Sequence, residues 1–142
     1  MKTDLNILLS DHQVLYQKLR NYHWNVKGPL FFGLHQKFEE MYLAAAENVD
    51  ALAERIVAIG GRPASTLAGQ LELARLSEDP ESPNANTMVA NLVADLGQLT
   101  GWLRTAATRA SEANDVATLN MLESMADSEE QTTWMLKAFL AE

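Results

Sequence analysis

Four long stretches of this chain place apolar residues at every third or fourth position, and no stretch alternates as a β-strand would. The spacing predicts helices over residues 4–27, 33–60, 86–113 and 116–140. Glycine and proline follow the first of these stretches and a glycine pair ends the second, as expected just past a helix end. The pattern therefore predicts an all-α protein built as a bundle of four helices.

The connection between the second and third predicted helices, residues 61–84, is long for a compact domain. It holds three of the four prolines of the chain, and residues 67–76 within it have the leucine spacing of a short helix. A long crossover of this kind lets the two helices that it joins run parallel. We expect a single domain, 1–142, with a short extra helix in the crossover.

The composition excludes several classes of function. The chain has no cysteine, so disulfides, thiol nucleophiles and thiolate metal sites are absent. It has no apolar run long enough to span a membrane and no signal-peptide pattern at its start, which favours a cytoplasmic protein. Eleven basic residues are scattered among nineteen acidic ones, giving a net charge of −8. Nucleic-acid binding depends on basic clusters and is not expected.

Two pairs of potential metal ligands stand on the second predicted helix. His35 and Glu39 are four residues apart, as are Asp50 and Glu54, so each pair lies on one face of the helix. Eleven residues separate Glu39 from Asp50, which is about 16 Å along a helix and too far for one ion to be shared.

A second copy of this helix, antiparallel across a two-fold axis, would bring the two pairs together. His35 and Glu39 of one chain would then lie beside Asp50 and Glu54 of the other chain. The midpoint falls within three consecutive alanines, 44–46, whose small side chains would let the two helices approach closely. The spacing therefore predicts a metal site between subunits.

Simpler interpretations of the same residues remain open at this point. His23, twelve residues before His35, ends the first predicted helix and could be a ligand, a partner of the helix dipole or a core residue. The pair formed by Asp50 and Glu54 could be a solvated helix face. No carboxylate partners His12 locally, and we interpret it as structural.

Several motifs of this chain also resemble one known family. They are Asn21–Gly28 (NYHWNVKG), Phe31–Tyr42 (FFGLHQKFEEMY), Asp50–Ile56 (DALAERI), Ile59–Pro63 (IGGRP) and Trp134–Leu140 (WMLKAFL). With these motifs the chain resembles the Dps-type mini-ferritins over essentially its whole length. The resemblance implies a ferritin-like four-helix bundle with a long crossover carrying a short extra helix, assembled as a hollow homo-dodecamer.

The resemblance also implies a ferroxidase centre at each dimer interface. Its catalytic and metal-binding residues would be His23, His35 and Glu39 of one subunit with Asp50 and Glu54 of its two-fold mate. Such a centre oxidises Fe(II), with hydrogen peroxide or oxygen as the oxidant, and the Fe(III) is stored as mineral in the cavity. The metal would be iron, Fe2+ and Fe3+, and the function iron storage and protection against oxidative damage.

Three features bear on how closely the chain follows this family. Glu39 stands where the family often has aspartate, and only Lys2 precedes the first helix where many members carry a lysine-rich tail that binds DNA. We therefore do not expect DNA binding, and a nucleoid-associated packing protein is the alternative function. The third feature is the lining of an iron entry pore, for which Glu112, Asp115 and Glu123 are candidates. The ligands of the metal site itself would also suit zinc.

Overall fold

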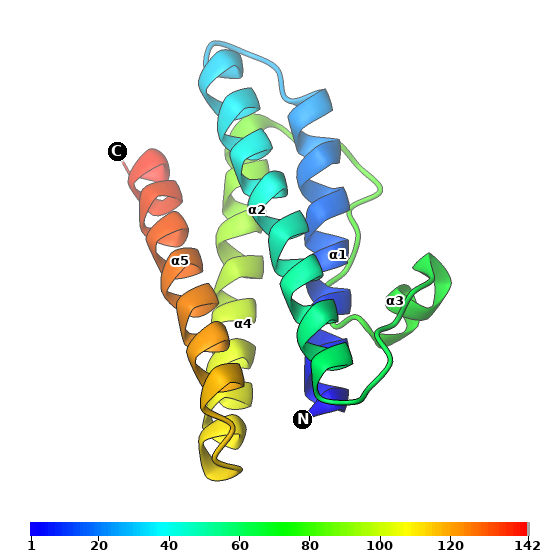
Figure 1. The fold of residues 1–142 in the computed structure, drawn as a ribbon. Coiled ribbons are helices and arrows are strands. Elements are labelled where there is room, and N and C mark those ends of the chain that lie inside the picture. The colour runs from blue at the N-terminus through cyan, green and yellow to red at the C-terminus, as the bar shows by residue number, and fades with distance from the viewer. Residues whose placement is uncertain (142) are drawn as a thin grey trace.

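The computed structural model describes residues 1–141, which form five helices and no strand (Figure 1). The helices are α1 (Lys2–Asn25), α2 (Phe31–Ala58), α3 (Leu67–Leu73), α4 (Ala85–Glu112) and α5 (Val116–Leu140). The all-α prediction and the short helix in the crossover are confirmed, and each helix end lies within three residues of its predicted position. None of these described helices is both long and apolar enough to span a membrane.

The four long helices form two antiparallel hairpins that pack side by side. One hairpin is α1 with α2, the other is α4 with α5, and α1 also packs against α4 (Figure 1). The crossover carries the chain from the end of α2 back to the opposite end of the bundle, so α2 and α4 run parallel, as predicted. The short helix α3 lies against α1, on the side away from α5.

Glycines with left-handed backbone help to end the helices of the first hairpin. Gly60 follows α2 with φ of 85°, and its N–H donates to the Val57 carbonyl at 3.0 Å. Gly28 has φ of 108° in the turn between α1 and α2. Glycine tolerates this backbone at little cost. The helix α1 ends two residues earlier than predicted because Val26 is already extended, with φ −60° and ψ 141°.

Asp115 begins α5 and also ties it to α2. Its carboxylate accepts hydrogen bonds from the Thr118 N–H and hydroxyl, at 3.2 and 2.6 Å, and from Arg55 at 2.8 Å. The predicted N-cap is thus confirmed. We expect Asp115→Ala to lower the free energy of unfolding by about 0.5–2 kcal/mol, the range for lost N-caps. Asp115→Asn keeps the cap and should lose less, which denaturant titration of both variants would measure.

Asp115 should also make the stability of the fold depend on pH in the acidic range. Hydrogen bonds from Thr118, together with the charge of Arg55, hold the pKa of Asp115 below its ordinary value. Its contribution is therefore present above about pH 3.8 and is lost as the pH falls through the lower pKa of the folded state. An acid-unfolding curve that is identical in Asp115→Asn and the wild type would contradict this assignment.

The buried apolar residues form two clusters, one in each half of the bundle. The half nearer the α1–α2 turn includes Leu19, Tyr22, Phe38, Leu92 and Leu99, and the other half includes Leu5, Leu52, Ile56, Leu103 and Leu122. Between the two clusters, α1 buries three polar residues in a row, Ser10, Asp11 and His12. Asp11 accepts two hydrogen bonds from the Arg75 side chain and one each from the Arg75 and Leu76 N–H groups.

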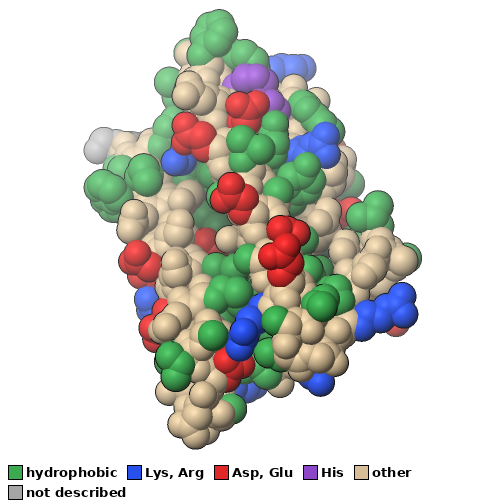
Figure 2. Space-filling view, viewed as in Figure 1, with side chains coloured by type: hydrophobic (Ala, Val, Ile, Leu, Met, Phe, Trp, Pro, Cys, Tyr) green, Lys and Arg blue, Asp and Glu red, His purple; other side chains and the backbone are tan. Residues whose placement is uncertain are grey.

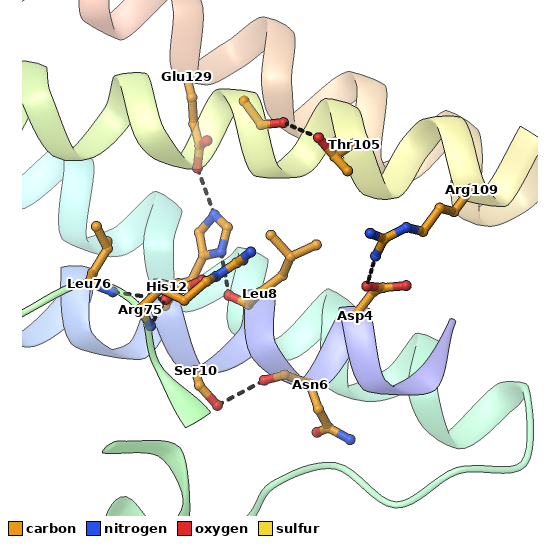
Figure 3. A network of polar contacts seen from close by, with 12 residues as sticks. Asp4, Asn6, Leu8, Ser10, His12, Arg75, Leu76, Thr105, Arg109 and Glu129 are labelled. Carbon is orange, nitrogen blue, oxygen red and sulfur yellow. Dashed lines mark hydrogen bonds and ion pairs between the residues drawn. The ribbon is translucent and has the colours of Figure 1, made fainter. Parts of the chain in front are cut away.

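His12 joins the two hairpins through this polar layer (Figure 3). Its Nε2 lies 2.7 Å from Glu129 Oε1 on α5, and its Nδ1 lies 2.8 Å from the Leu8 carbonyl. Burial opposes a charge on the ring, but the hydrogen bond and negative charge of Glu129 outweigh it and raise the pKa of His12. Its complete burial supports the interpretation of His12 as a structural residue, and its carboxylate partner comes from the other end of the sequence.

Candidate metal centre

The turn between α1 and α2 brings two histidines together. His23 lies in the last turn of α1 and is buried, and His35 lies near the start of α2 and is partly exposed. Their rings stack with centroids 3.7 Å apart and planes inclined by 12°. Figure 2 shows histidine near one end of the bundle, with acidic side chains beside it. The sequence separation of twelve residues is thus closed by the hairpin.

Each of these histidines is held by the backbone of the other. His23 Nδ1 lies 2.6 Å from the His35 carbonyl oxygen, and His35 Nδ1 lies 2.7 Å from the His23 carbonyl oxygen. A carbonyl oxygen can only accept, so each Nδ1 carries the proton and donates. In a neutral ring this leaves a free electron pair on Nε2, which is the state in which histidine binds a metal.

Glu39 is the third predicted ligand that the structure brings to this place. It stands one helical turn after His35, and its Oε1 lies 3.9 Å from His23 Nε2. Zinc, for example, holds nitrogen and oxygen ligands at about 2.0–2.2 Å, so two ligand atoms 3.9 Å apart can bind the same ion. Half of the Glu39 side chain is exposed, which leaves its carboxylate open to a further partner.

Asp50 and Glu54 lie apart from this group within one chain. Both are exposed on α2, which runs as one helix from Phe31 to Ala58 and holds the two pairs apart as predicted. Within residues 1–141, no group of three or more histidine, aspartate or glutamate side chains stands close enough to hold a metal ion. The complete five-residue site therefore stays a prediction that requires a second subunit.

Two aromatic residues beside the histidines were missed in the sequence analysis. The Phe31 ring stacks on His35 at 4.9 Å, and the Tyr42 ring meets His23 edge-on at 5.3 Å. The Tyr42 hydroxyl also donates to Glu39 Oε1 at 3.4 Å. Burial, helped by the charge of Glu39, raises the pKa of Tyr42, so the hydroxyl keeps its proton. Helical spacing could have identified both, since they lie four residues before His35 and three after Glu39.

The acidic residues predicted for an entry pore do not all lie together. Glu112 and Glu123 line a groove of about 620 Å³ between α4 and α5, which also holds Asp127 and Glu130. Asp115 does not line this groove, because its carboxylate is engaged with Arg55 and Thr118. The pore itself remains a prediction.

Comparison with known proteins places this fold in a family. A family model of the ferritin-like domain matches residues 2–142. The chain is 47% identical over 136 residues to the "DNA protection during starvation protein" of Brevibacillus brevis, covering 96% of this chain and 91% of that one.

Solved structures lead to the same family. The Dps protein of Staphylococcus aureus is 40% identical, with a TM-score of 0.97 and coverage of 99% of this chain and 95% of that one. The Dps protein of Vibrio cholerae, described as a member of a broad superfamily of ferritin-like diiron-carboxylate proteins, is 35% identical with a TM-score of 0.96 and coverage of 99% and 88%. The chain belongs to the ferritin-like superfamily and, within it, to the Dps-type mini-ferritins.

Proposed function

We propose that this protein is a ferroxidase that takes Fe(II) as its substrate and stores the Fe(III) product as mineral inside a hollow homo-dodecamer. Membership of the Dps-type mini-ferritins supports a role in iron storage and protection. The observation that carries the proposal is the reciprocal hydrogen bonding of His23 and His35, which leaves both Nε2 atoms free to bind a metal, with His23 Nε2 3.9 Å from Glu39 Oε1. Imidazole and carboxylate are ligands that suit iron.

The remaining ligands would come from a second subunit. If two α2 helices pair antiparallel about the midpoint of Ala44 and Ala45, residues equally far from that midpoint face one another. His35 then meets Glu54 of the partner subunit, and Glu39 meets Asp50 of the partner subunit. This would complete the ligand set with two further carboxylates, which are exposed in the single chain.

Exposed apolar residues of α2 support the same pairing. Phe32 is 83% exposed and Val57 is 59% exposed, and they are equally far from the midpoint. Leu43, 54% exposed, has the same relation to Ala46. Burying such side chains against one another would stabilise the dimer, while the small residues at the centre allow close approach. The pairing that assembles the ligands therefore also covers apolar surface.

Hydrogen peroxide is the oxidant that we propose, with oxygen as the alternative. One peroxide molecule accepts two electrons, one from each of two Fe(II) ions, and with two protons it leaves as two water molecules. Fe(II) and peroxide are consumed together, so no hydroxyl radical is released. The chain's own residues would bind and orient the ions, since the backbone carbonyls fix both imidazoles before any metal arrives.

DNA packing is not favoured as the function, although the relative from Brevibacillus brevis is named for DNA protection. Of the eleven basic side chains, six are paired with carboxylates within residues 1–141, namely Lys18, Lys37, Arg55, Arg75, Arg104 and Arg109. Paired cations are less available to neutralise phosphates, and the net charge of −8 repels a polyanion. We propose that protection arises from iron chemistry.

The test is to load purified protein with Fe(II) without oxygen, add hydrogen peroxide, and follow near-ultraviolet absorbance together with particle mass. We expect rapid oxidation of about two Fe(II) per peroxide in a soluble particle of twelve subunits, because the ligand set suits iron. Preloading with Zn(II), which competes for the same ligands, should slow the reaction. A particle that assembles but leaves iron to precipitate as in buffer alone would contradict the ferroxidase and leave the fold untouched.

A further inference from the structure

We infer that Tyr42 is a positioning residue of the proposed metal centre, where its hydroxyl holds the Glu39 carboxylate beside the imidazole of His23. The inference rests on the proposed function, since it concerns the same site. Tyr42 would bind no metal itself. Its role would be to fix in advance a ligand that is otherwise free to turn into solvent.

The contact to Glu39 comes from the helix. Tyr42 follows Glu39 by three residues, which places the two side chains as neighbours on one face of α2. The hydroxyl donates to Oε1 at 3.4 Å, and this is the only side-chain hydrogen bond that Glu39 makes within residues 1–141. Glu39 Oε1 is also the atom that lies 3.9 Å from His23 Nε2. The hydroxyl therefore points at the oxygen that would meet the metal.

The ring of Tyr42 is itself held in place from two sides. Its edge-on contact with His23 has planes inclined by 77°, and a second edge-on contact joins it to Tyr16 at 5.8 Å. The Tyr16 hydroxyl accepts a hydrogen bond from Arg20 at 3.3 Å, and the Arg20 guanidinium lies over the Tyr16 ring. Phe31, His35, His23 and Tyr42 thus form a run of packed rings, and the direction of the Tyr42 hydroxyl follows from that packing.

Loss of the hydroxyl should free the carboxylate without disturbing the rings. A half-exposed glutamate samples several rotamers, and metal binding would then have to order it. Outer-shell partners of metal ligands typically contribute about 10–100-fold to metal affinity. The Tyr42 bond is long and half-exposed, so we expect the lower end, about tenfold.

The experiment compares Tyr42→Phe with Tyr16→Phe in the assembled protein, using anaerobic Co(II) as the probe. Co(II) takes the same nitrogen and oxygen ligands, and its visible absorption reports their arrangement. We expect about tenfold weaker Co(II) binding and an altered visible spectrum in Tyr42→Phe. Tyr16→Phe, which loses a hydroxyl in the same cluster but touches neither Glu39 nor His23, should match the wild type.

A second comparison, made in a variant that lacks Glu39, tests whether Tyr42 acts through Glu39 or through general packing. In Glu39→Ala, which keeps the two histidines and the carboxylates of the partner subunit, adding Tyr42→Phe should change Co(II) affinity no further. An equal loss in both backgrounds would overturn the inference, because the tyrosine would then act through His23 or through the fold. Unchanged affinity of Tyr42→Phe alone would overturn it as well.

The outcomes also separate this inference from the proposed function. A wild-type protein that assembles but binds no Co(II) would overturn the metal centre itself, and with it the role of Tyr42. If Tyr42→Phe does not assemble, Tyr42→Leu takes its place, because it also removes the hydroxyl and leaves every proposed ligand unchanged. Wild-type Co(II) affinity in Tyr42→Leu would then overturn the positioning role.

Discussion

Replacing His35 with alanine is expected to abolish rapid Fe(II) oxidation by hydrogen peroxide while the particle remains assembled. The substitution removes one Nε2 ligand and the ring that stacks on His23, whose Nδ1 can still donate to the backbone carbonyl of residue 35. Outer-shell changes already cost about 10–100-fold in metal affinity or activity, so loss of a ligand should slow oxidation at least about 100-fold. His35 is only partly buried, so the cost to folding should be small. The initial rate of absorbance change after peroxide addition measures the effect.

The matched control is Gln98→Ala, an exposed side chain on α4. It should oxidise Fe(II) at the wild-type rate, and both variants should have the wild-type particle mass. Wild-type oxidation kinetics in His35→Ala would remove His35 from the site. A smaller particle would instead assign His35 to the subunit contact.

Replacing Glu129 with alanine is expected to cause a large loss of stability. The exchange leaves the His12 ring, which is fully buried, without its carboxylate partner. Breaking a buried ion pair on one side costs about 3–5 kcal/mol. Denaturant unfolding at fixed subunit concentration measures this, with the concentration held constant because assembly adds to apparent stability.

The double exchange His12→Leu with Glu129→Met is the control for this prediction. It removes both polar partners and leaves no charge stranded in the core, so it should cost much less than Glu129→Ala alone. A double variant as unstable as the single one would show that the volume of these side chains matters and that their pairing does not.

The same pair predicts how stability changes with pH. The pKa of His12 is raised above its ordinary value of 6.5 in the folded chain, against the opposing effect of burial, because the hydrogen bond and charge of Glu129 favour the protonated ring. The stability that this pair contributes is therefore complete below pH 6.5 and is lost as the pH rises through the folded pKa. Glu129→Gln should flatten the dependence in that range, and an unchanged pH profile would contradict the pairing.

The helices could be predicted because the signals that form and end them are local. Gly60 marks the end of α2 and Asp115 the start of α5, and each acts through neighbours a few residues away. The contacts that join distant parts of the chain carry no such signal. His12 and Glu129 are 117 residues apart in the sequence, and Asp11 and Arg75 are 64 apart. Their pairing depends on how the finished helices pack.

In the candidate site, too, some features could be predicted from local spacing and others could not. The spacing of His35 and Glu39 predicted that they share a helix face, and the structure places Glu39 within 3.9 Å of His23. The hydrogen bonds from each ring to the other residue's carbonyl could not be predicted, because they depend on where two helix ends meet. Asp50 and Glu54 lie apart from this group in the single chain, and their place in the proposed site stays a prediction.

The reciprocal carbonyl contacts also restrict how the chain can vary in length. The orientation of the His35 ring depends on the last turn of α1, and that of the His23 ring depends on the first turns of α2. The length of the connection, residues 26–30, therefore sets the position of the two rings relative to each other. Inserting or deleting a residue there would misalign both imidazoles although every ligand residue is still present, so the length of this turn is constrained together with the site.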